Sequence, residues 1–203
     1  MKPRRSLAVF ALLIVLVSGC LGAATGDSLS FSSSPARASE AAVAHTGFEK
    51  MRSASPTFEH DFDVGGKSYH VRLDSHVTYY RADYRGATLA YAAILSTPKA
   101  AVMGQGLNPA GHLGGTDLVE RALSAVSDVQ AAKKVGTREV RILGEQVTVT
   151  KYRATDGNGN SNAYVLFARI EHDGDYVVAA ASYPAEMDGA ERDAITLFRS
   201  IRH

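Results

Sequence analysis

The chain has 203 residues, with 22 Lys and Arg against 21 Asp and Glu, and it contains one cysteine. This length suits one domain with a substantial core. The balanced charge gives no reason to expect nucleic acid or a polybasic membrane contact as a partner. A single cysteine also excludes an intramolecular disulfide and a multi-thiolate metal site, so the domain is expected to fold on its core alone.

The first residues have the features of an export signal. Lys2, Arg4 and Arg5 precede an unbroken apolar run of 11 residues, Leu7–Val17. That length lies within the roughly 7–15 residues of a signal-peptide core and below the about 18 residues of a membrane-spanning helix. The paired arginines also resemble a twin-arginine signal, so the sequence leaves the export route, Sec or twin-arginine, open.

Directly after this run, Val17-Ser18-Gly19-Cys20 resembles the lipobox of prokaryotic lipoproteins, in which the cysteine is alkylated by a lipid and the preceding peptide bond is cut. The alternative is an ordinary signal peptide with a chance cysteine. We expect residues 1–19 to be a lipoprotein signal peptide, Cys20 to be the lipid attachment site, and residues 20–36, which are small and polar, to form a flexible tether. The domain would then lie outside the cell, held on the membrane by lipid.

Residues 37–203 are expected to form a single domain. It opens with a short helix, Ala38–His45, which Gly47 ends. A hairpin follows with its turn at Gly65-Gly66. This turn predicts the pairs Asp63 with Ser68, Asp61 with His70, and Glu59 with Arg72, and the second strand is expected to continue through Val77 and Tyr79. Next come a strand at Thr88–Leu95, a long loop at Ser96–Gly115, and a helix at Thr116–Gln130 with Thr116 as its N-cap.

Two further hairpins are predicted in the second half of the domain. Gly144-Glu145 is expected to turn the first and to place Val140 opposite Val149. Asp173-Gly174, a strong type I′ signal, turns the second, between strands at 163–171 and 176–183. The final helix, at 188–202, is expected to begin with a capping box formed by Asp188 and Glu191. Small residues on one face of the last hairpin predict that the helix at 116–130 or the helix at 188–202 crosses there; they are Ala168, Ala179 and Ala181. The alternative is that they lie beneath a ligand cleft.

This element order predicts an α+β domain. We expect a mostly antiparallel sheet of about six or seven strands covered by helices on both faces, an α/β/α sandwich, because the strands of the last hairpin are apolar on both faces and need cover on both. The order of elements resembles that of the PsbP-like sandwich. Fold alone does not fix function.

The mature chain resembles a family of haloarchaeal secreted lipoproteins of unassigned function over roughly residues 35–203. That resemblance implies export and anchoring, without a catalytic assignment. The nearly balanced charge departs from the acidic surfaces usual for such organisms. The residues that carry the resemblance are Thr46-Gly47-Phe48, Ser96-Thr97-Pro98, Gly104-Gln105-Gly106, Asn108-Pro109, Leu143-Gly144, Tyr183-Pro184 and Ile201-Arg202-His203.

The loop at 96–115 is the first candidate for a ligand site, because structureless loops beyond about 12–15 residues are uncommon unless they are functional or disordered. Its hydrogen-bonding side chains are Ser96, Thr97, Gln105, Asn108 and His112. The alternative is a structural loop, in which Asn and Pro form turns and cap the next helix.

Histidines and acids of the first hairpin are weak candidates for a metal site. Asp61 and His70 are predicted cross-strand neighbours, and His76 shares their face if the strand stays regular. Imidazole and carboxylate together suit zinc or copper. However, Glu59, Asp63 and Arg72 lie on the same face, which favours a solvated surface of paired charges, so no metal or cofactor is assigned.

The chain has no Gly-x-Ser-x-Gly elbow and no phosphate-binding glycine loop. We therefore expect a binding or interaction module for an unknown protein or small molecule, rather than an enzyme. The alternatives are a small hydrolase using His112 or His70, or a His/Asp metal-binding protein at the cell surface.

Overall fold

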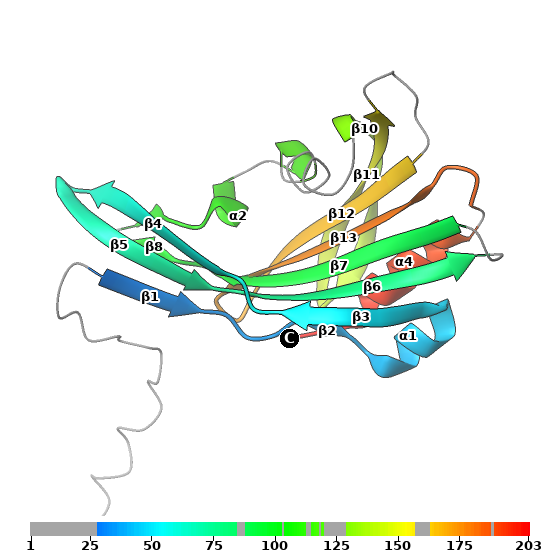
Figure 1. Ribbon diagram of the computed structural model, residues 1–203, viewed down its shortest axis with the longest axis horizontal. Helices are drawn as coiled ribbons and strands as arrows, with labels where there is room; N and C mark the ends of the chain where they lie inside the picture. The colour runs from blue at the N-terminus through cyan, green and yellow to red at the C-terminus, as the bar shows by residue number, and fades with distance from the viewer. Residues whose placement is uncertain are drawn as a thin grey trace, which may run out of the picture.

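The structure, a computed structural model, describes residues 28–84, 88–102, 104–112, 115–117, 119, 129–156, 163–187 and 189–203. Its main feature is a curved antiparallel sheet of seven strands in the order β10-β11-β12-β13-β7-β6-β3. A second sheet, in the order β1-β5-β4, extends from one end of the molecule (Figure 1). Two small ladders pair β14 with β2 and β8 with β9.

The strands are β1 Ser28–Ser32, β2 Arg37–Ala38, β3 Phe48–Ala54, β4 Thr57–Val64, β5 Lys67–Asp74, β6 His76–Tyr84, β7 Thr88–Pro98, β8 Ala101–Val102, β9 Gln105–Gly106, β10 Val129–Ile142, β11 Glu145–Asp156, β12 Ala163–His172, β13 Asp175–Pro184 and β14 Ile201–Arg202. The helices are α1 Glu40–Thr46, α2 Pro109–His112 and α4 Ala190–Arg199.

Three local predictions are confirmed. The β4–β5 hairpin turns at Gly65-Gly66 and has the predicted register throughout, including Asp61 opposite His70. The β12–β13 hairpin turns at Asp173 and Gly174, whose φ angles of 47° and 84° are those that a type I′ turn requires. The first helix ends at Gly47, whose φ of 69° is the left-handed conformation that glycine adopts without steric cost.

Two strand predictions were wrong. The β10–β11 hairpin turns at Leu143 and Gly144, so Val140 lies opposite Val147 and not Val149. The strand predicted to continue from the first hairpin through Val77 instead breaks at Ser75. The buried Ser75 separates β5 from β6, which belongs to the large sheet, and Ser75 N donates to the Pro56 carbonyl. Periodicity of apolar residues continues across this break and therefore does not reveal it.

One face of the large sheet carries the main core. Helix α4 packs against it with Ala194, Leu197 and Phe198, each no more than 1% exposed, and α1 lies beside α4. The predicted small patch, Ala168, Ala179 and Ala181, belongs to this same core cluster. Helix α4 contacts β13 and shares this cluster, so a helix does pack on the face that carries these alanines, as predicted.

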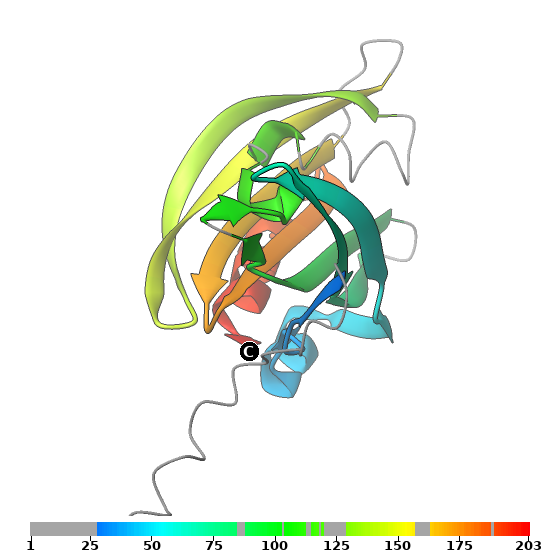
Figure 2. The ribbon, with the colours of Figure 1, turned by 90° about the vertical axis from the view of Figure 1, so that its left-hand side faces the viewer.

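The predicted α/β/α sandwich was wrong. The domain is mostly β-structure, and no layer of helices covers the second face of the sheet among the described residues. That face is strongly curved, and α2 lies within its curve (Figure 2). Val119 packs there on Tyr152 and Phe167, and Gly111 and Gly115 approach Tyr176 and Tyr152 closely. Apolar residues on both strand faces correctly required cover, but on this face the curvature of the sheet, α2 and Val119 supply part of it.

The end of the chain also differs from the prediction. Helix α4 begins after Gly189, which makes no side-chain cap, so the predicted Asp188 capping box is not the N-terminus of this helix; Asp188 itself lies outside the described residues. The helix stops at Arg199, and β14 then pairs Ile201 with Ala38 of β2. The first and last described segments are thereby joined. The predicted helix at 116–130 lies largely outside the described residues, although Val129 already begins β10.

The signal peptide, Cys20 and the first part of the expected tether lie outside the described residues. The later part, residues 28–36, is structured: β1 pairs in parallel with β5, and Ser33 and Ala36 are buried. Among the residues that the structure describes, no helix is long and apolar enough to cross a membrane.

Candidate metal centre

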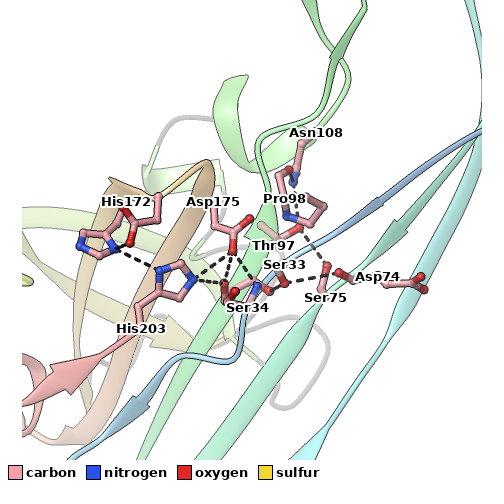
Figure 3. A network of polar contacts seen from close by, with 12 residues as sticks. Ser33, Ser34, Asp74, Ser75, Thr97, Pro98, Asn108, His172, Asp175 and His203 are labelled. Atoms are coloured by element: carbon pink, nitrogen blue, oxygen red, sulfur yellow. Dashed lines mark hydrogen bonds and ion pairs between the residues drawn. The ribbon is translucent and has the colours of Figure 1, made fainter. Parts of the chain in front are cut away.

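A buried polar network connects the turn end of the last hairpin to the end of the chain (Figure 3). At its centre is His203, whose side chain is 1% exposed. Its Nε2 lies 3.0 Å from Asp175 Oδ2 and 3.1 Å from Ser96 Oγ. Asp175, the first residue of β13, also accepts a hydrogen bond from the Ser34 backbone N–H at 2.8 Å. Four segments distant in sequence therefore meet at one carboxylate.

The contacts of Asp175 determine which nitrogen of His203 carries the proton. An ionised carboxylate can only accept hydrogen bonds, so Nε2 of His203 must be the N–H that faces it. The neutral ring then has its lone pair on Nδ1. This nitrogen lies 3.1 Å from Nδ1 of His172, and the two rings meet edge-on at a centroid distance of 5.3 Å.

Asp173 completes a group of three metal-ligating residues. One ligand atom from each of His172, Asp173 and His203 lies within 4.8 Å of the other two. The Asp173 carboxylate is 3.5 Å from Nδ1 of His172 and is 79% exposed, whereas the His172 side chain is 23% exposed. The carboxylate can therefore adjust to an ion, while the two imidazoles are held by their surroundings.

The local fold explains why these groups meet. His172 ends β12 and Asp173 begins the two-residue turn, in which its positive φ is tolerated because Asp adopts the left-handed region more readily than most residues. His203 directly follows β14, which the ladder with β2 fixes in place. Asp175 pairs with His172 across the hairpin, so one turn supplies two possible ligands and the carboxylate that orients the third.

Ser96, His203 and Asp175 have the composition of a catalytic triad but not its geometry. In a triad the serine and the carboxylate contact different nitrogens of the imidazole. Here both contact Nε2, and Ser96 is completely buried. A nitrogen that donates its proton to Asp175 cannot also take the proton of Ser96. This arrangement therefore positions the ring rather than activating a nucleophile.

The predicted ligand loop is mainly structural where it is described. Ser96 and Thr97 belong to β7, and Thr97 Oγ1 accepts hydrogen bonds from Ser75 and Asn108. Asn108 Oδ1 accepts from the Ala110 N–H in the first turn of α2, so the alternative of a capping loop holds here. Gln105 is exposed on β9, away from these contacts. The side chain of His112 lies outside the described residues.

The predicted metal candidates do not come together as a set. Asp61 and His70 do meet, at 2.8 Å, on an exposed surface that also carries the pair of Arg72 and Glu59. His76 lies in the other sheet, where its Nδ1 is 3.0 Å from Ser55 Oγ. The break at Ser75 causes this separation. Sequence reasoning missed His172 and His203 because no spacing relates them; the only local signal was a histidine next to the Asp-Gly turn.

The comparisons with known proteins identify the family. The model described as a domain of unknown function, DUF6517, matches residues 35–202, and the chain therefore belongs to that family. No curated protein matches the chain. Among solved structures, it is similar to the solution structure of cyanobacterial PsbP (CyanoP) from Synechocystis sp., with 16% identity, a TM-score of 0.43, and coverage of 92% of this chain and 98% of that one.

Proposed function

We propose that this member of the DUF6517 family is an extracytoplasmic metal-binding module that holds a divalent transition-metal ion between His172, His203 and Asp173. One observation carries the proposal: the Nδ1 atoms of His172 and His203 face each other at 3.1 Å. Two imidazole nitrogens bound to one tetrahedral Zn²⁺, each about 2.0–2.1 Å from the ion, lie about 3.3 Å apart. The two rings therefore need only a small movement to admit an ion.

The contact between Asp175 and His203 supports this role. Histidines that bind metals commonly donate their other N–H to a carboxylate, which fixes the tautomer and makes the metal-facing nitrogen more basic. Asp175 has that position relative to Nε2 of His203. Without an ion, the same nitrogens can share a proton in a hydrogen bond, so metal binding replaces one contact and leaves no buried group without a partner.

The ligand set indicates the class of metal. Two imidazoles and one carboxylate suit Zn²⁺, Cu²⁺ and Ni²⁺ better than Ca²⁺ or Mg²⁺, which prefer sites built from oxygen atoms alone. Three protein ligands leave room for water or a further ligand on the ion. The partly exposed side chain of His172 and the exposed side chain of Asp173 give an ion access from solvent.

The proposed location follows from the N-terminal sequence. The apolar run before Cys20 and the lipobox support a lipid anchor, and the resemblance to haloarchaeal lipoproteins supports an outward-facing domain. The module would then bind metal on the outer face of the cell membrane. The rival class is a small hydrolase using His112 or His70. The buried Ser96 adds no catalytic triad to it, because its Oγ contacts the same nitrogen of His203 as Asp175 does.

Isothermal titration of the purified full chain with Zn²⁺ tests the metal proposal. We expect one ion to bind per chain, and His172→Gln to weaken binding at least tenfold, since one of three ligands is lost. His172 is the variant of choice because its partly exposed ring contributes less to the buried network than that of His203.

The matched control is His70→Gln, which alters a histidine beside a carboxylate on the other sheet. It should leave the stoichiometry and affinity of the principal site unchanged. The proposal is wrong if the wild-type chain binds no Zn²⁺, or if His172→Gln binds as tightly as wild type.

A further inference from the structure

A second feature is a surface cavity of about 280 Å³ beside β2, bordered by β3 and β6. None of its lining residues is a ligand of the proposed metal centre. The lining is cationic and rich in hydroxyl groups; its polar members are Arg37, Lys50, Ser53, Ser55, His76 and Thr78. No carboxylate contributes to it.

Positive charge gathers at this cavity, and among the described residues no acidic side chain lines it. Arg37 lies directly opposite Arg202 in the ladder between β2 and β14. Like charges in that position repel each other and destabilise the pairing. In the described ranges of the chain, no carboxylate forms an ion pair with Arg37, Arg202 or Lys50. An anion in the cavity would relieve the repulsion that the fold itself creates.

Each hydroxyl group of the lining has a hydrogen-bond partner within it, and the geometry still leaves O–H protons for a ligand. Ser53 Oγ lies 3.2 Å from Thr78 Oγ1, its cross-strand partner on β6. Whichever hydroxyl donates within the pair, the other keeps a free O–H for a ligand. Ser55 Oγ lies 3.0 Å from Nδ1 of His76, and an N–H donated by the ring would likewise leave the serine O–H free.

We propose that this cavity binds a phosphoryl group. The planar guanidinium of Arg37 matches two phosphate oxygens at once, the ammonium of Lys50 adds a point charge, and the paired hydroxyls satisfy the remaining oxygens. The volume is close to the lower limit of small-molecule sites, which suits a small ligand or a single headgroup. The same chemistry could come from a soluble phosphate or from a phospholipid of the membrane on which the domain is held.

Calorimetric titration of the purified full chain with inorganic phosphate, in metal-free buffer of low ionic strength, tests the soluble source. Saturable binding at one site is expected. Arg37→Gln should weaken it at least about tenfold, the loss of one charge-assisted contact. Lys133→Gln, which removes an exposed cation of β10 far from the lining, should leave it unchanged.

Thermal unfolding provides an independent readout. Phosphate should raise the melting temperature of the wild-type chain but not that of Arg37→Gln. Without phosphate, Arg37→Gln should be at least as stable as wild type, because the substitution removes the repulsion with Arg202. A purely structural role for Arg37 predicts the opposite, a less stable variant.

The lipid source is tested by co-sedimentation of the full chain with phosphatidylcholine vesicles that contain or lack phosphatidic acid, in a Cys20→Ser background that removes the lipid attachment site. Vesicles without phosphatidic acid measure the binding that the N-terminal apolar run contributes by itself. Binding that requires both phosphatidic acid and Arg37 assigns the cavity to a headgroup. The proposal is overturned if neither phosphate nor these vesicles bind, or if Lys133→Gln weakens binding as much as Arg37→Gln does.

Discussion

The Nδ1 atoms of His172 and His203 lie 3.1 Å apart, although 31 positions separate the two residues in the chain. One histidine ends a strand at a hairpin turn, and the other follows a two-residue strand after the last helix. The buried Asp175 holds the second ring so that its unprotonated nitrogen faces the first. The account of this protein as a metal-binding module rests on that convergence.

Asp175→Asn tests whether this carboxylate orients His203 for metal. The amide would keep most of the volume but lose the negative charge that accepts from Nε2 of His203 and from the Ser34 N–H. We expect Zn²⁺ affinity to fall about 10–100-fold and the free energy of unfolding to fall by about 1–3 kcal/mol. Calorimetry and denaturant unfolding measure the two effects. Asp61→Asn, an exposed carboxylate beside a histidine, is the control; unchanged Zn²⁺ affinity in Asp175→Asn would refute the orienting role.

Ala179→Leu tests the packing of α4 on the sheet. Ala179 is completely buried and shares a core cluster with Leu197 and Phe198 of the helix. A leucine there should overpack the core and cost about 1–3 kcal/mol. The control is Ala180→Leu, the next residue of β13, whose side chain lies on the opposite and less buried face. Denaturant melts compare the midpoints, and an unchanged midpoint for Ala179→Leu would contradict close packing at this position.

These two sites show what the sequence could and could not predict. The turns at Gly65-Gly66 and Asp173-Gly174 depend on the φ angles of the turn residues themselves, so local reasoning placed them correctly. The packing of a helix near Ala179 was predictable because the side chains on that face of the hairpin are small. The meeting of His172 with His203 depends on the pairing of β14 with β2, a contact between the two ends of the domain. No periodicity or motif records such a contact.

The prediction of an α/β/α sandwich failed for a similar reason, because local sequence patterns do not show what covers a strand. Residues 129–156 form two long strands, and the first of them begins inside the segment predicted as a helix. Long twisted strands curve, and a curved sheet can enclose part of its own apolar face without a layer of helices. Alternating apolar residues in β11, such as the buried Tyr152, indicate that this face of the sheet is covered. They do not indicate whether helices or the curved sheet itself cover it.

Glu191→Gln tests a charged cluster at the start of α4. Glu191 accepts hydrogen bonds from Lys151 at 2.7 Å and from the Tyr183 hydroxyl at 3.1 Å. Burial alone would raise the pKa of Glu191, but these contacts, with Lys151 foremost, outweigh it and hold the pKa below its ordinary value of 4.5. Because the folded-state pKa is depressed, the charged glutamate stabilises the fold above the unfolded pKa and ceases to do so as pH falls through the folded pKa.

The wild-type chain should therefore exceed Glu191→Gln in stability by a few tenths to about 1 kcal/mol near pH 6, and this difference should shrink as the pH falls below about 4.5. Denaturant unfolding at pH 6 and pH 3 measures it. Glu139→Gln, which alters an exposed carboxylate on β10, serves as the control variant. A difference that stays constant between the two pH values would show that Glu191 acts through packing and not through charge.

Cys20→Ser tests the anchor. The variant should lose its lipid and be released from the membrane fraction or accumulate as an unprocessed precursor, because a serine hydroxyl cannot replace the thiol in lipidation. Fractionation and the mass of the purified chain measure the two results. Ser28→Ala, at the start of β1, is the control and should be processed and retained like wild type. Processing and retention of Cys20→Ser would contradict the lipobox interpretation.

The most direct test of the central claim is nuclear magnetic resonance of the ¹⁵N-labelled imidazole rings during a Zn²⁺ titration of the full chain. The account predicts that Nδ1 of both His172 and His203 acquires the shift of a metal-bound nitrogen, while Nε2 of His203 keeps its proton toward Asp175. Rings elsewhere, such as His70 and His76, should keep their shifts at one equivalent of Zn²⁺. Coordination through Nε2 of His203, or a first equivalent taken up by His70 or His76, would contradict it.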